Sequence, residues 1–153
     1  MSVTTKHTKD TKRELPPGWR WARLGEACKF INGDAYKESD WGNEGLPIIR
    51  IQNLNDEEKP FNFWGGTIDS KVRIDNGDLL LAWSGTPGTS FGAHIWNRGP
   101  GLLNQHIFKV LTDSSLDKEW AMRAINVALV DLIKAAHGAV GLAHVTKREV
   151  ESL

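Results

Sequence analysis

The sequence has a single cysteine, Cys28, which excludes an internal disulfide and a zinc site built from several thiolates. Its neighbours Ala27, Lys29 and Phe30 suggest neither a catalytic base nor an orienting group, so we interpret Cys28 as a packing residue. No apolar run approaches the roughly 20 residues that a membrane-spanning helix needs. The polar N-terminus lacks the apolar core of a signal peptide, so we expect a cytoplasmic protein with no membrane partner.

The sequence also lacks an excess of charge of either sign. Its 19 lysines and arginines balance 19 aspartates and glutamates, which gives a formal net charge of zero. Nucleic-acid-binding domains usually carry a basic surface, so this balance counts against DNA binding. It does not exclude DNA binding, because charges can gather on opposite faces and partner chains can supply phosphate contacts.

Motifs that carry catalysis are missing as well. The five histidines show no His-x-x-x-His metal spacing, and the glycine-containing segment 85–88 has no P-loop lysine. We expect no catalytic serine at Ser84 or Ser90. Asp75 and Asp78 flank a tight turn, and we interpret them as turn formers. The sequence therefore predicts no enzyme activity, no metal and no cofactor.

The order of apolar and turn-forming residues predicts an α+β fold, a glycine-broken twisted β-sheet with a late amphipathic helix. We expect a disordered polar tail over 1–14 and one domain over 15–153. The helix is predicted over 120–136, capped by Ser114 or Ser115 and stopped by Gly138. Segment 84–89 is predicted to be a loop. The strands are expected at 47–52, 79–83, 91–96 and 106–110, with a further candidate at 19–24.

Seven tryptophans are unusual in a chain of 153 residues. We interpret most of them as core residues, because large aromatic rings dominate apolar packing. The alternative is that exposed rings form a stacking platform, which would make the protein a carbohydrate- or peptide-binding module.

Several segments together resemble the target-recognition domain of type I restriction-modification specificity subunits. They are 15–19 followed by 24–26, then 45–54, 77–85, 103–107 and 137–146. The resemblance covers about residues 15–153. It implies a non-catalytic domain that reads one half of a bipartite site in double-stranded DNA, while modification (methyltransferase) and restriction subunits carry out methylation and cleavage. Subunits of this family generally carry two such domains joined by long helices, so we infer a truncated or half-length subunit.

The resemblance implies that polar loops enter the major groove. Arg50 or Arg98 would donate to guanine, and amide side chains would pair with adenine. The loop after the apolar run at 79–83 would allow close approach of its backbone to DNA. Arg50 could instead pair with an acidic residue, and Asn104 and Gln105 could satisfy local backbone groups. The predicted contact residues are Arg50, Gln52, Asn53, Ser84, Gly85, Thr86, Gly88, Arg98, Asn104 and Gln105.

Overall fold

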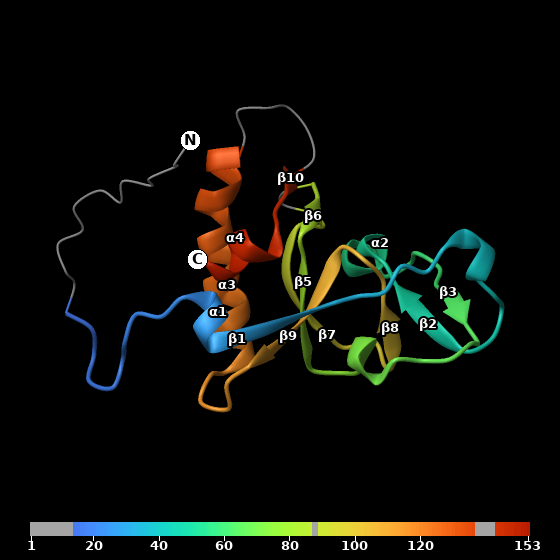
Figure 1. The fold of residues 1–153 in the computed structure, drawn as a ribbon, viewed down its shortest axis with the longest axis horizontal. Coiled ribbons are helices and arrows are strands. Elements are labelled where there is room, and N and C mark those ends of the chain that lie inside the picture. Colours follow the sequence, from blue (N-terminus) through green and yellow to red (C-terminus); the bar gives the residue numbers. More distant parts are fainter. Residues whose placement is uncertain (1–13, 87–88, 137–142) are drawn as a thin grey trace.

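The computed structural model describes residues 14–86, 89–136 and 143–153. Two four-stranded sheets form the body of the molecule, and α1, α3 and α4 gather at one end of it, whereas α2 lies beside the second sheet (Figure 1). The predicted α+β fold is confirmed, but its β part is two sheets rather than one. The predicted tail lies outside the described residues except for Glu14, and so does the predicted helix stop at Gly138. Within the described residues, no helix is both long enough and apolar enough to cross a bilayer.

The first sheet is antiparallel and has the strand order β1-β9-β5-β7. The 19-residue helix α3 packs along it, with most of its contacts to β7, while the short helices α1 and α4 pack on each other. The elements are α1 (Leu24–Ala27), β1 (Cys28–Asn32), β5 (Asp78–Ala82), β7 (Gly92–Trp96), β9 (Ile107–Thr112), α3 (Lys118–Ala136) and α4 (Lys147–Glu151).

The second sheet has the order β3-β2-β8-β4 and is mixed, because β2 runs parallel to β8. A separate ladder of two short strands, β6 and β10, follows the end of β5 (Figure 1). The elements are η1 (Glu38–Asp40), β2 (Leu46–Ile49), α2 (Ile51–Asn55), β3 (Asn62–Trp64), η2 (Ser70–Val72), β4 (Arg73–Ile74), β6 (Ser84–Gly85), β8 (Gly101–Leu103) and β10 (Ala143–His144).

Strand β5 lies between two hydrophobic cores and contributes side chains to both. Successive side chains of a strand point to opposite faces, and here both faces are covered. Leu79 and Leu81 pack in the core under α3, whereas Leu80 packs in the core of the second sheet. All three leucines are fully buried. This arrangement explains the uninterrupted apolar run of β5, which strands buried on both faces require.

Helix α3 uses its apolar stripe as predicted, because Ala121, Ile125 and Leu129 are buried against the first sheet. Its polar side chain Asn126 accepts a hydrogen bond from the Ala93 N–H (2.7 Å) and donates one to the Ala93 carbonyl (3.0 Å). Ala93 belongs to β7, which is an edge strand. The helix therefore covers an edge that would otherwise present unpaired backbone groups.

The predicted serine cap of α3 is wrong. Asp117 provides the cap, since its Oδ1 accepts a hydrogen bond from the Trp120 N–H at 2.8 Å. Ser115 instead donates its N–H and its hydroxyl to Asp113. An aspartate directly before the helix is the better partner for its positive end, because it brings a charge as well as an acceptor.

Three predicted β features are also wrong. Segment 19–23 forms no strand and leads directly into α1. The strand expected over 47–52 ends at Ile49, because Asn53 accepts a hydrogen bond from the Arg50 N–H (3.0 Å) and starts α2. The expected loop over 84–89 begins as strand β6, which pairs with β10 almost 60 residues later in the chain.

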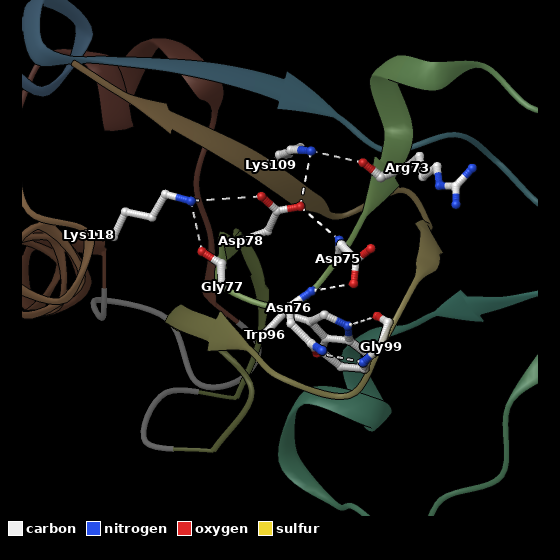
Figure 2. Close-up of polar contacts among 9 residues, drawn as sticks. All are labelled: Arg73, Asp75, Asn76, Gly77, Asp78, Trp96, Gly99, Lys109 and Lys118. Atoms are coloured by element: carbon white, nitrogen blue, oxygen red, sulfur yellow. Dashed lines mark hydrogen bonds and ion pairs between the residues drawn. The ribbon is translucent and has the colours of Figure 1, made fainter. Parts of the chain in front are cut away.

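A polar network joins the two sheets through the turn before β5 (Figure 2). Lys109 on β9 lies 3.1 Å from the Asp78 carboxylate and donates to the Arg73 carbonyl on β4 at 2.9 Å. The Asp78 carboxylate also accepts a hydrogen bond from the Asp75 N–H (2.8 Å), which confirms both aspartates as turn formers. Lys118 of α3 donates to the Gly77 carbonyl at 2.8 Å. These contacts fix the position of one sheet relative to the other.

Candidate nucleic-acid interface

Three polar segments meet where β2, β5 and β8 end, and we call them the polar edge: residues 50–52, 83–86 and 104–106. The Asn104 N–H donates to the Ile49 carbonyl, and the Trp83 N–H donates to the His106 carbonyl, both at 3.1 Å. Gly85 lies against Ile51, because a side-chain carbon at position 85 would be 3.7 Å from Ile51 Cγ2. Since β2 and β8 belong to one sheet and β5 to the other, the polar edge depends on how the two sheets pack.

The turn at 104–106 is held by the segment 33–36, which sequence reasoning missed. The Gln105 N–H donates to the Asp34 carbonyl at 2.8 Å, and the Asn104 side-chain oxygen accepts from the Tyr36 N–H at 3.3 Å. Gly33 is needed here, because a side chain would overlap the Asn104 backbone carbonyl. The turn-forming run Asn-Gly-Asp at 32–34 was the available signal.

His106 completes the turn in an uncommon backbone conformation. Its φ is +74°, and it is the only described non-glycine residue with a positive φ. Its ring lies 4.8 Å from the Trp83 ring, and its buried Nδ1 has no hydrogen-bond partner among the described residues. The backbone of the turn is thus fixed from several sides, while Gln105 at its tip is exposed.

The structure uses the predicted amide residues differently. Asn53 is 2% exposed, and its amide donates to the Lys59 and Pro60 carbonyls at 3.1 and 3.4 Å. The expectation that Asn53 faces DNA is therefore not met, because this side chain shapes α2 and the chain after it. Asn104 is half-buried and holds Tyr36, which matches the local role considered for it. Gln52 lies half-buried in the first turn of α2.

The two predicted guanine readers, Arg50 and Arg98, also differ. The Arg98 guanidinium donates to the Asn53 and Glu57 carbonyls at 2.7 and 2.9 Å and lies over the rings of Phe61 and Trp96. Arg98 therefore stabilises the end of α2 and is removed from the candidate contacts. Arg50 lies over the Trp41 ring at 4.8 Å, and no described residue accepts a hydrogen bond from its guanidinium.

Thr86, directly after β6, is hydrogen-bonded to the residues that precede β7. The Thr86 carbonyl accepts hydrogen bonds from the N–H groups of Thr89, Ser90 and Phe91 at 3.2–3.3 Å, and the Ser90 hydroxyl oxygen accepts one from the Thr86 N–H at 3.1 Å. Thr86 is exposed, and Ser84 and Gly85 are half-buried within β6. Gly88 lies outside the described residues, so its predicted contact stays a prediction.

Residues 88–92 read Gly-Thr-Ser-Phe-Gly, which matches the Gly-x-Ser-x-Gly pattern of a nucleophile elbow. Such an elbow presents an exposed serine between a strand and a helix. Here Ser90 is only 6% exposed, and the chain continues into strand β7. The serine of this Gly-x-Ser-x-Gly sequence is therefore a buried residue and does not have the exposed position of a nucleophile elbow. Among the described residues, no group of three or more His, Cys, Asp or Glu side chains is placed to hold a metal ion.

Comparison with known proteins decides the family. A family model for the type I restriction modification DNA specificity domain matches residues 16–153. The chain belongs to this family. The resemblance seen in the sequence is thereby confirmed, and so is the coverage of nearly the whole chain.

Relatives with this specificity domain are longer than the chain. The specificity subunit of the type I restriction enzyme EcoBI of Escherichia coli is 25% identical over 136 residues, which are 87% of this chain and 27% of that subunit. The HsdS subunit from Thermoanaerobacter tengcongensis shares the fold with a TM-score of 0.68 at 19% identity, over 95% of this chain and 34% of that one. A chain from a structure that concerns the assembly of the type I R-M system also shares the fold. Its TM-score is 0.63 at 20% sequence identity, and the match covers 94% of this chain and 35% of that one. The chain thus spans about a third or less of these proteins.

Proposed function

We propose that this specificity domain recognises a short sequence in double-stranded DNA and reads one half of a bipartite site for a type I restriction-modification complex. The observation that carries the proposal is the polar edge, where segments from both sheets converge in a domain of the DNA-specificity family. The family favours this function over the carbohydrate- or peptide-binding alternative.

The tryptophans support the same choice. Trp96 is buried, and Trp41, Trp64 and Trp83 are half-buried, so these four contribute to packing. The exposed rings are Trp19, Trp21 and Trp120. Trp19 meets the ring of Trp120 on α3 edge-on at 5.7 Å, at the helical end of the molecule (Figure 1). Trp19 and Trp120 therefore lie near the start of α3, not along the polar edge.

The side chains that we propose for contact with DNA are Arg50, Gln52, Thr86 and Gln105. An arginine suits guanine, and a glutamine suits the edge of adenine. Each good bidentate pair discriminates by about 1–3 kcal/mol, so a few pairs are enough for a short half-site. Ser84 and Gly85 would bring the backbone of β6 close to the groove. Because the chain has no net charge, we propose that partner subunits supply much of the phosphate contact.

We further propose that the domain is not catalytic. In this proposal modification (methyltransferase) subunits transfer the methyl group, a restriction subunit cleaves the DNA, and the complex acts in the cytoplasm. The burial of Ser90, the serine of the Gly-x-Ser-x-Gly sequence, supports this division of roles.

The test places this domain in a full-length specificity subunit that is assembled with its modification subunits. Changing Arg50→Gln together with Gln52→Ala and Gln105→Ala should alter or abolish methylation that depends on one half-site. The other half-site should be read as before. The matched control is Trp21→Ser, which changes an exposed residue of the segment that leads into α1. Unchanged methylation in the triple variant would remove these residues from the interface, and binding of an oligosaccharide with no DNA effect would refute the function.

A further inference from the structure

The two arginines that the sequence offered as guanine readers are stacked on aromatic rings, but only one has free donors. The Arg98 guanidinium donates hydrogen bonds to two backbone carbonyls. Arg50 has no hydrogen-bond acceptor among the described residues, and no described carboxylate lies within ion-pair distance of it. Arg50 is nevertheless half-buried, with its guanidinium carbon 4.8 Å from the centre of the Trp41 ring.

Trp41 is itself fixed to the polar edge. Its indole N–H donates to the Tyr36 carbonyl at 3.3 Å, and the Tyr36 N–H donates to the Asn104 side chain at 3.3 Å. On the other side, the Gly42 N–H donates to the Phe63 carbonyl of β3 at 2.9 Å. A chain of contacts therefore runs from the turn at 104–106 through Tyr36 and Trp41 to Arg50.

A stacked arginine is well suited to reading a base. The ring holds the planar guanidinium by its face, and the N–H donors in the plane stay available for two parallel hydrogen bonds. Guanine offers O6 and N7 as a matching pair of acceptors in the major groove. Fixing the long side chain in advance also lowers the entropy cost of binding.

We propose that Trp41 is a positioning residue that holds Arg50 for recognition of a guanine in the half-site. The proposal rests on the proposed function and deepens it. It assigns Arg50 as the residue that binds the base, guanine as the base, and Trp41 as the residue that orients the Arg50 side chain. A phosphate oxygen could accept the same two hydrogen bonds, so the experiment must separate base reading from backbone contact.

The experiment uses the full-length subunit assembled with its modification subunits. The probe is a pool of duplex DNA with a randomised half-site and a constant second half. Bound duplexes are sequenced to give the preference at each base pair, and affinity is measured against salt concentration for the winning sequence. The variants are Arg50→Gln, Arg50→Lys, Trp41→Leu and Trp41→Phe. The control is Trp120→Leu, which removes a tryptophan of α3 whose ring contacts Trp19 and neither Tyr36 nor Arg50.

We expect Arg50→Gln to lose about tenfold or more of the preference for guanine at one position, and Arg50→Lys to lose much of it, because lysine lacks the planar fork. Trp41→Leu should lower that same preference by about three- to tenfold, whereas Trp41→Phe should keep it within about twofold. Trp120→Leu should leave the preference in place even if it lowers the melting temperature.

Three results would overturn parts of the reasoning, and they can be told apart. If the unaltered complex selects no sequence in the randomised half, the proposed function fails. If it selects a sequence and Trp41→Leu leaves every preference intact, only the role of Trp41 fails. If Arg50→Gln weakens binding to all sequences equally and lowers the salt dependence by about one counterion, Arg50 contacts a phosphate and the guanine assignment is wrong.

Discussion

The ion pair between Lys109 and Asp78 gives the sharpest test of how the two sheets are held together. The pair is 3.1 Å long, and its side chains are only 18% and 20% exposed. The Asp78 carboxylate also accepts a hydrogen bond from the Asp75 N–H, and Lys109 reaches the Arg73 carbonyl on the other sheet (Figure 2). Asp78→Ala therefore removes the carboxylate partner of Lys109 and of Lys118, which lies 4.0 Å away, and leaves the Asp75 N–H without its acceptor.

Hydrogen bonds to charged groups contribute about 1.5–3 kcal/mol each, and partial exposure reduces the value. We expect Asp78→Ala to lower the free energy of unfolding by about 2–3 kcal/mol. Asp78→Asn should cost about 1 kcal/mol, because an amide oxygen can still accept from the Asp75 N–H. For a chain of this length, 1 kcal/mol corresponds to about 2–4 °C in melting temperature.

Urea unfolding of Asp78→Ala, Lys109→Met and the double variant measures the coupling between the two side chains. We expect a coupling energy of about 1–2 kcal/mol. The comparison pair is Lys147–Glu151, whose side chains are 50% and 40% exposed and should couple by about 0.5 kcal/mol or less. A coupling at Lys109–Asp78 as small as that of the comparison pair would refute the view that this network fixes the sheets.

Three further predictions follow from buried contacts. Burial lowers the pKa of His94 in the folded state, so the unfolded chain takes up the proton first and stability should fall as the pH drops below about 6.5. His94→Gln should reduce that loss in unfolding curves measured between pH 8 and pH 5, and an unchanged pH dependence would exclude His94 as its source. Asn126→Leu should lower the free energy of unfolding by about 2–3 kcal/mol, because it removes both hydrogen bonds to Ala93. A cost below about 0.5 kcal/mol would mean that the edge of β7 needs no such cover. Gly33→Ala should destabilise the chain by about 1–3 kcal/mol, because the added carbon would overlap the backbone of Asn104. A neutral substitution there would show that the turn can move aside.

The parts of the fold that depend on local pattern could be predicted from the sequence. The apolar run of β5 and the stripe of α3 are of this kind, since burial on both faces or on one face leaves a direct trace in the residue order. The predicted strand at 47–52 failed because the Arg50 N–H donates to the Asn53 side chain, and this hydrogen bond ends the strand after Ile49. Strand β6 was missed because its partner is distant in the sequence, and no local pattern reports such pairing.

The candidate site shows the same limit. Its segments at 50–52, 83–86 and 104–106 were found, because polar residues after apolar strands indicate exposed ends. The roles of individual residues in these segments could not be predicted, because nothing in the sequence distinguishes Arg50 from Arg98 as a guanine-binding residue. The difference comes from tertiary contacts: two carbonyls near α2 accept from Arg98, and none among the described residues accepts from Arg50.

The position of β5 between two cores links stability to recognition in this domain. The polar edge takes residues 50–52 and 104–106 from the ends of the second sheet and residues 83–86 from the end of β5. A shift of one sheet against the other would therefore move Arg50 relative to Thr86, even if neither residue changed. The Lys109–Asp78 network lies at the start of β5 (Figure 2), and residues 83–86 of the polar edge follow the other end of that strand. Substitutions in it should consequently alter half-site preference as well as melting temperature, whereas an equal loss of stability at Asn126, within the first sheet and α3, should leave the preference unchanged.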